Sequence, residues 1–315
     1  MPDLVLLGDL SGDANVRLAL ASPGQRPKAS QRYDCRSLED LGAALDDYLG
    51  AHDDPPLVGA AFAACGWERN GGLSMPNHNY SIQRSWLLGR LNVKRLNLVN
   101  DCVSKGLAIE RLLASEKTPL IGGESDPSQP RAMIGVANGL GTVVLLTDEF
   151  GRVTALPCEG GHSDLAVHSE RERLVLKALG RKYGHVSRER AISLPGLVDL
   201  WQSLVGMDGG QLRPASPADV VALARGRDPH AAEAVAMSVG WLAATASDLA
   251  LICGARGGIY LAGDYFSLVG GLLDRDAFAI RFGDKGRLSD YVREIPVNIV
   301  SAPEPELIGL TTLFG

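Results

Sequence analysis

The sequence predicts an α/β protein made of two lobes. Short apolar runs bounded by Gly, Asn or Asp alternate with longer stretches whose apolar residues have helical spacing. The chain has 315 residues, more than one hydrophobic core usually serves, which favours two lobes with a cleft between them. A strand, Gly-rich turn and second strand occur in each half of the chain, which indicates a duplicated architecture.

Composition narrows the class of protein. An apolar fraction of 45% and a charged fraction of 22% are typical of a globular protein with a sizeable core. The net charge of -6 and the lack of any Lys/Arg-rich run argue against nucleic acid as a partner. The five cysteines are scattered without Cys-x-x-Cys spacing, which favours reduced thiols in a cytoplasmic protein. We see neither a signal-peptide pattern nor a run approaching the about 20 apolar residues of a membrane span, so no membrane partner is expected.

The expected strands are short apolar runs, and the expected helices are the longer periodic stretches between them. The strands are LVLLG, LVGAAFAAC, RLNLVND, AMIGVA and GGIYLAG, which begin at residues 4, 57, 95, 132 and 257. The helices are expected over residues 37–52, 81–91, 102–115, 169–184 and 230–254.

The lobe boundary is expected just before a polar stretch. SEKTPLIGGESDPSQPR, residues 115–131, has the Pro, Gly and Ser content of a loop or hinge. Residues 1–114 with 300–315 are therefore predicted to form a small lobe, and residues 115–299 a large one. The final stretch, IPVNIVSAPEPELIGLTTLFG, is expected to form a strand and a last helix that packs back onto the first lobe.

The two predicted hairpins carry the Gly-rich turns. LVLLGDLSGDANVRLALA and AMIGVANGLGTVVLLTD begin at residues 4 and 132. The first turn lacks the Lys of a Walker loop and the helix of a Rossmann fingerprint. Its backbone N–H groups could face phosphate oxygens, with Asp9 holding Mg²⁺ or a metal-bound water. The alternative is a tight turn with surface aspartates, since Gly-rich hairpins also occur in α/β proteins without such a site.

Asn100 and Asp101 lie where an expected strand meets an expected helix. Strand ends in α/β proteins open onto clefts, so a carboxylate there is placed to take a proton from a substrate hydroxyl. The alternative is a helix cap, a role that Asn and Asp also fill.

A Glu and a His flank a double glycine in LPCEGGHSDLA. Glu159 and His162 could hydrogen-bond the hydroxyl groups of one small ligand. Zinc is a weaker interpretation, because neither a Cys pair nor a His-Glu-x-x-His helix is present, and plain polar surface is the third. Glu189, in GHVSRERAISLPGL, adds another carboxylate at an expected helix start.

Five blocks of sequence together resemble the bacterial glucokinase family of the hexokinase/actin/Hsp70 ATPase superfamily. They follow the family order from near residue 4 to near residue 310, and the Cys-rich zinc motif of the related repressor/sugar-kinase branch is missing. The blocks are NHNYSI, LVNDCVSKGLAIERLL, LPCEGGHSDLA, GHVSRERAISLPGLVDLW and GDKGRLSDYVREIPVNIV. The resemblance implies an actin-like, ribonuclease H-like fold with an active-site cleft between two lobes, a homodimer, and ATP-dependent phosphorylation of the glucose 6-hydroxyl with Mg²⁺.

The resemblance also implies roles for individual residues. Asp101 matches the general base, and Asn100 a sugar ligand. The other positions that match sugar-binding residues are Asn77, Glu159, His162 and Glu189. The positions that align with the nucleotide loops are Asp9, Gly12, Asn15, Arg17, Asn138, Gly139, Gly141 and Gly263, with Asp9 also at the metal.

The nucleotide loops depart from the family pattern. The first loop is one residue longer, with Ser11 at a glycine position and Asp13 in place of the hydroxyl donor. Ala137 and Asn138 replace Gly and Thr in the second loop. Asp264 and Glu306 stand at two further glycine positions.

These departures leave two functions open. A carboxylate about 4 Å from a phosphate oxygen would oppose ATP binding by about 4 kcal/mol at an effective dielectric near 20. The favoured function is an ATP-dependent glucokinase, because Asp9 and Asp101 are retained. The alternative is a catalytically impaired sugar-binding or sensor protein on the same fold.

Overall fold

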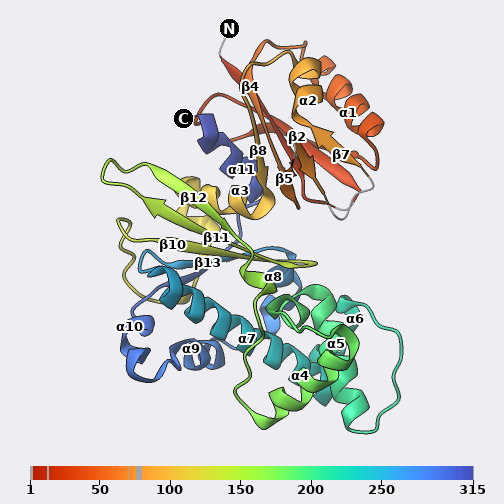
Figure 1. The fold of residues 1–315 in the computed structure, drawn as a ribbon, viewed down its shortest axis with the longest axis vertical. Helices are drawn as coiled ribbons and strands as arrows, with labels where there is room; N and C mark the ends of the chain where they lie inside the picture. Colours follow the sequence, from red (N-terminus) through yellow and green to blue (C-terminus); the bar gives the residue numbers. More distant parts are fainter. Residues whose placement is uncertain (1–2, 13, 70, 76–79, 315) are drawn as a thin grey trace. The chain divides into compact units, whose positions relative to one another are not determined.

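The protein divides into two compact units in its computed structural model (Figure 1). Unit 1 is Met1–Ala114 with Ala302–Gly315, and unit 2 is Ser115–Ser301. The structure describes residues 3–12, 14–69, 71–75 and 80–314. Two residues singled out above, Asp13 and Asn77, lie outside these ranges.

Unit 1 is built on a sheet in the order β3-β2-β1-β4-β8. β1 pairs antiparallel with β2 and parallel with β4, and β4 pairs parallel with β8. The strands are β1 Leu4–Leu10, β2 Asn15–Ala21, β3 Lys28–Asp34, β4 Leu57–Ala64 and β8 Leu96–Asn100. A second, small sheet contains β5 Trp67–Arg69, β6 Gly72–Ser74 and β7 Ser81–Gln83.

Helices cover both faces of the main sheet of unit 1. The period-two pattern of β1 explains this, because Leu6 and Leu10 join one apolar cluster while Val5 and Leu7 join another. The first cluster includes residues of α1 and α2, and the second residues of α11. The helices are α1 Leu38–Gly50, α2 Arg84–Leu91, α3 Asp101–Ala108 and α11 Pro305–Thr311, with 3₁₀ turns η1 Ile109–Arg111 and η7 Thr312–Phe314. The expected last helix, packed back onto the first part of the chain, is thus confirmed as α11.

Unit 2 repeats the plan with a larger sheet, in the order β12-β11-β10-β13-β14-β9. β10 pairs antiparallel with β11 and parallel with β13, as β1 does with β2 and β4. The strands are β9 Lys117–Ile121, β10 Arg131–Val136, β11 Leu140–Thr147, β12 Val153–Cys158, β13 Ile259–Ala262 and β14 Val297–Val300. The duplicated architecture that the two hairpins predicted is therefore confirmed.

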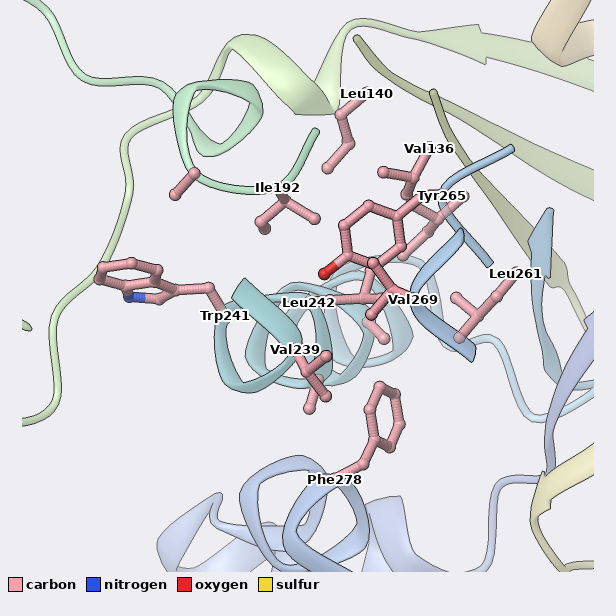
Figure 2. Close-up of a cluster of buried hydrophobic side chains, with 14 of the residues drawn as sticks. Val136, Leu140, Ile192, Val239, Trp241, Leu242, Leu261, Tyr265, Val269 and Phe278 are labelled. Atoms are coloured by element: carbon pink, nitrogen blue, oxygen red, sulfur yellow. The ribbon is translucent and has the colours of Figure 1, made fainter. Parts of the chain in front are cut away.

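The core of unit 2 gathers around the long helix α7, and Figure 2 shows part of it. Val239 and Leu242 of α7 lie among side chains from the strands and from α8 and α9, including Leu261, Tyr265 and Phe278. The helices are α4 Glu170–Tyr183, α5 Leu194–Met207, α6 Pro217–Arg225, α7 Pro229–Cys253, α8 Asp264–Val269, α9 Arg275–Gly283 and α10 Ser289–Arg293. The short 3₁₀ helices are η2 Ala114–Glu116 at the unit boundary, η3 Gly160–His162, η4 Arg188–Arg190, η5 Gly270–Leu272 and η6 Gly286–Leu288.

α7 corrects the expectation that no segment approaches a membrane span. By length and composition it could cross a membrane, and it is the one such helix among the described residues. However, 61% of its most apolar window is buried within the protein, as in the core helix of a globular unit.

Three local predictions also need correction. The stretch expected as a loop contains β9, an edge strand in which Pro119 is tolerated because an edge position does not need every N–H. The expected helix over 81–91 begins only at Arg84, since residues 81–83 pair with β6. Glu189 lies in the 3₁₀ turn η4 rather than at the start of an α-helix, which begins at Leu194.

Candidate active site

Asn100 and Asp101 occupy the turn from β8 into α3, as the sequence predicted. The Asn100 side chain accepts a hydrogen bond from the Cys102 N–H at 2.8 Å and donates to the Gly66 carbonyl at 3.0 Å. Asn100 is therefore the helix cap, so the Asp101 carboxylate is not needed for that role. Asp101 begins α3, and its side chain is 15% exposed.

The Asp101 carboxylate belongs to a buried cluster of charges. The Lys105 ammonium donates to Asp101 Oδ2 at 2.7 Å and lies 3.1 Å from Glu306 Oε1. Burial opposes ionisation of Asp101, but the Lys105 charge outweighs it and holds the pKa of Asp101 below its usual value. The same carboxylates raise the pKa of Lys105 well above its usual value, against the effect of burial. Asp101 is consequently an ionised carboxylate in a mostly dry setting.

Close packing of α11 against α3 brings Glu306 into this cluster. A Cβ on Gly309 would lie 1.7 Å from the Ser104 carbonyl oxygen, so only glycine fits at this crossing. The approach of the two backbones places Glu306 beside Lys105, which lies one turn along α3 from Asp101.

Asp9 lies at the end of β1 and is almost fully buried. One of its carboxylate oxygens accepts the Ser11 N–H at 2.9 Å, within the first Gly-rich turn. Burial, followed by the negative charge of Glu306, raises the pKa of Asp9 to about 6. Arg17 stands opposite Asp9 in the β1–β2 register, and a Cβ on Gly12 would lie 2.6 Å from Asn15 Nδ2. The first turn thus gathers four of the predicted phosphate-loop positions.

The raised pKa of Asp9 predicts a pH-dependent cost to stability. In the unliganded fold the neutral carboxyl is favoured, so its stabilising effect is complete below the unfolded pKa of 3.8 and is lost as the pH rises through about 6. Asp9→Asn is expected to increase the free energy of unfolding at pH 8 by about 3 kcal/mol. Calorimetric unfolding at pH 4 and pH 8 measures this.

The matched control for Asp9 is Asp34→Asn, an exposed carboxylate at the end of β3 in the same sheet. It is expected to change stability by less than about 0.5 kcal/mol at either pH. If Asp9→Asn were less stable than wild type at pH 8, this would contradict the claim that the ionised Asp9 carboxylate destabilises the fold at that pH.

The acidic cluster suits a cation. Asp9, Asp101 and Glu306 interact with Lys105, so carboxylates outnumber the ammonium in this cluster. Across the described ranges, no group of three or more His, Cys, Asp or Glu side chains forms a metal cage. Mg²⁺ generally takes one or two carboxylates and fills its remaining positions with water and phosphate oxygens, so Asp9 fits that kind of site.

In unit 2 the second Gly-rich turn is held by Glu189. The Leu140 N–H donates to Glu189 Oε2 at 3.0 Å, and a Cβ on Gly139 would lie 2.6 Å from that oxygen. The structure therefore places Glu189, predicted as a sugar ligand, beside Gly139, predicted as a nucleotide-loop residue. Asn138, next in the turn, is exposed, and Gly141 lies on β11.

Glu159 precedes η3 and His162 is its last residue, and η3 packs on β11. The Gly160 N–H donates to Thr142 Oγ1 of β11 at 3.0 Å, so η3 is anchored close to the second turn. His162 Nε2 lies 3.9 Å from Glu159 Oε2, and these side chains are 62% and 77% exposed. Both side chains are therefore accessible to a ligand.

Gly263 and Asp264 lie at the end of β13. A Cβ on Gly263 would lie 2.2 Å from the Val136 carbonyl oxygen, and its φ is 112°, so this position requires glycine. Gly263 thus lies against the end of β10, next to the second turn. Asp264, which replaces a family glycine, is exposed at the first residue of α8.

The structure thus collects the predicted residues into two groups, one in each unit. Unit 1 contributes Asp9, Gly12, Asn15, Arg17, Asn100 and Asp101, and unit 2 contributes Asn138, Gly139, Gly141, Glu159, His162, Glu189 and Gly263. The sequence alone did not single out Lys105, which contacts both Asp101 and Glu306. Its spacing of four from Asp101 on a helix was the available signal.

The chain is similar to known proteins over nearly its whole length. The family model described as Glucokinase matches residues 6–314. A glucokinase from Nitrobacter hamburgensis is 36% identical over 316 residues, covering 99% of this chain and 98% of its own. A crystal structure of glucokinase from an Antarctic psychrotroph has a TM-score of 0.89 at 25% identity, covering 100% of this chain and 99% of its own.

A more distant structure, a ROK family glucokinase from Streptomyces griseus in complex with glucose and AMPPNP, has a TM-score of 0.65 at 16% identity and covers 99% of both chains. It shows a likeness of fold alone. Together with the psychrotroph structure it confirms the predicted α/β, actin-like architecture of two lobes.

Proposed function

This chain belongs to the glucokinase family and is a sugar kinase, and from that premise we propose that it transfers the γ-phosphoryl group of ATP to the 6-hydroxyl of D-glucose, with ADP as the leaving group and Asp101 as the general base that accepts the hydroxyl proton. The observation that carries the proposal is the Asp101 carboxylate. It is ionised, mostly buried and released from helix capping by Asn100. A carboxylate of this kind accepts the hydroxyl proton as the new P–O bond forms.

We propose that the two Gly-rich turns bind the phosphates. The first turn provides Gly12, Asn15 and Arg17, and Asp9 would hold Mg²⁺. When bound, the ion would neutralise phosphate charge. The second turn and the glycine at the end of β13 provide the other proposed nucleotide contacts, Asn138, Gly139, Gly141 and Gly263. The exposure of Asp264 weakens the objection that its charge would oppose ATP.

The proposed sugar ligands include both hydrogen-bond donors and hydrogen-bond acceptors. Asn100 offers an amide, and Glu159 and His162 are exposed side chains that can accept and donate bonds. Glu189 engages Oε2 with the second turn, which leaves Oε1 for a sugar hydroxyl. Asn77 is proposed on its family position alone.

We also propose a cytoplasmic homodimer that has no nucleic-acid or membrane partner. The net charge of -6 and the scattered free cysteines support the location and the absence of nucleic acid.

The experiment that tests the function pairs calorimetry with a turnover assay. Glucose and Mg·ATP are titrated separately into the protein, and glucose 6-phosphate is then assayed with ATP, ADP or polyphosphate as donor. We expect binding of both ligands and turnover with ATP. Glucose binding without ATP binding or turnover would support the sugar sensor instead. Turnover only with another donor would correct the cofactor.

A further inference from the structure

Lys105 is a buried charged residue that the proposed reaction does not yet use. Its side chain is 11% exposed, and its ammonium lies 2.7 Å from Asp101 Oδ2 and 3.1 Å from Glu306 Oε1. Three rotatable N–H donors allow one ammonium to bind both carboxylates. Lys105 therefore links the proposed base to α11.

The groups facing this ammonium come from four parts of unit 1. Asp101 and Cys102 lie on its own helix, Glu306 on α11, and Asp9 on β1. The Cys65 thiol, beyond β4, also bonds to the Asp101 carboxyl group and lies 3.6 Å from the Ser11 carbonyl oxygen. The surroundings of Asp101 are dry and contain other carboxylates, two conditions that each disfavour its ionised form.

We propose that Lys105 is a positioning residue whose ammonium binds Oδ2 of Asp101, so that Oδ1 takes the proton of the sugar hydroxyl. The inference rests on the proposed role of Asp101 as general base. It adds the identity of the group that orients this base and selects which oxygen reacts.

Glu306 is the second carboxylate that binds the Lys105 ammonium. It stands at a position where the family resemblance gives glycine, and a glycine there could not contact Lys105 through a side chain. Because α11 packs closely on α3 at Gly309, Glu306 is held 3.1 Å from the ammonium and gives it a second carboxylate partner besides Asp101. The ion pair between Lys105 and Glu306 therefore depends on a residue that departs from the family pattern.

The experiment compares Lys105→Met, Lys105→Arg and Glu306→Gln with wild type. Methionine keeps the length of the side chain and removes its charge. Lys105→Met is expected to lower kcat about 100-fold with less than a threefold change in glucose KM, and to shift the acidic limb of kcat/KM upward by about one pH unit or more. Lys105→Arg is expected to have a kcat at least tenfold higher than that of Lys105→Met. The kcat of Glu306→Gln is expected to lie between the kcat of wild type and that of Lys105→Met.

Lys182→Met is the matched control, because Lys182 also binds an aspartate, Asp199, but belongs to unit 2, whereas Asp101 belongs to unit 1. Its kcat and pH profile are expected to stay within twofold of wild type. An equal loss in this control, or an unchanged pH profile in Lys105→Met, would overturn the inference.

A readout without turnover separates this inference from the proposed function. The ¹³C signal of the Asp101 carboxyl group can be followed by NMR from pH 3 to pH 8 in unliganded protein. The titration is expected at higher pH in Lys105→Met, and Lys105→Gln, which also removes the positive charge, is measured in the same way if the methionine variant does not fold. An unchanged titration overturns the role of Lys105. Wild type that fails to phosphorylate glucose overturns the proposed function instead.

Discussion

Asp101→Asn is expected to lower kcat for glucose phosphorylation by about 10³-fold, within the range that positioned general bases contribute. Asparagine has the same shape but cannot accept the hydroxyl proton. Because Asn100 supplies the cap of α3, the substitution leaves the start of the helix intact. Steady-state kinetics at saturating glucose and Mg·ATP measure the loss, and calorimetry measures glucose binding, which is expected to change less than tenfold.

The control for Asp101→Asn is again the exposed Asp34→Asn, which is expected to keep wild-type kcat. Activity of Asp101→Asn within tenfold of wild type would mean that another group, or none, accepts the proton. Equal losses of glucose affinity and kcat would instead indicate a collapsed site.

Gly309→Ala is expected to give the largest loss of stability. The added Cβ would lie 1.7 Å from the Ser104 carbonyl oxygen and 3.0 Å from the Ala108 N, both backbone atoms that cannot rotate away. Separating α11 from α3 costs about 3 kcal/mol or more, at the upper end of overpacking effects. Urea unfolding monitored by circular dichroism measures the free energy of unfolding.

Gly89→Ala provides the matched control in the same unit. Gly89 lies within α2, and no atom lies within 4 Å of the Cβ that alanine would add. Alanine is expected to stabilise this helix by about 0.5–1 kcal/mol. Similar free energies of unfolding for the two variants would contradict the close crossing of α11 and α3.

The repeated sheet plan could be predicted because it is written locally in the sequence. Each Gly-rich turn lies between two apolar runs, and each pair of runs forms an antiparallel hairpin. The strand β9 could not be predicted from its own residues, because Thr118, Pro119 and neighbouring polar residues match a loop. Only its pairing with β14, far along the chain, makes it a strand.

The residues of the candidate site also divide into those that a local pattern predicts and those whose contacts depend on tertiary packing. Asn100 and Asp101 were predicted because a strand and a helix meet there, which is a local pattern. Glu306 was noted as a departure, but its contact with Lys105 depends on a crossing of two helices about 200 residues apart in sequence. The contact of Glu189 with the second turn likewise depends on tertiary packing, which spacing alone does not specify.

The central claim is that this chain transfers a phosphoryl group from ATP to glucose. The most direct test is ³¹P NMR of wild type incubated with [6-¹³C]glucose and Mg·ATP. We expect a phosphate monoester coupled to C6, one ADP per ester, and loss of the signal in Asp101→Asn. Protein that binds glucose by calorimetry but forms no ester with ATP would contradict the account.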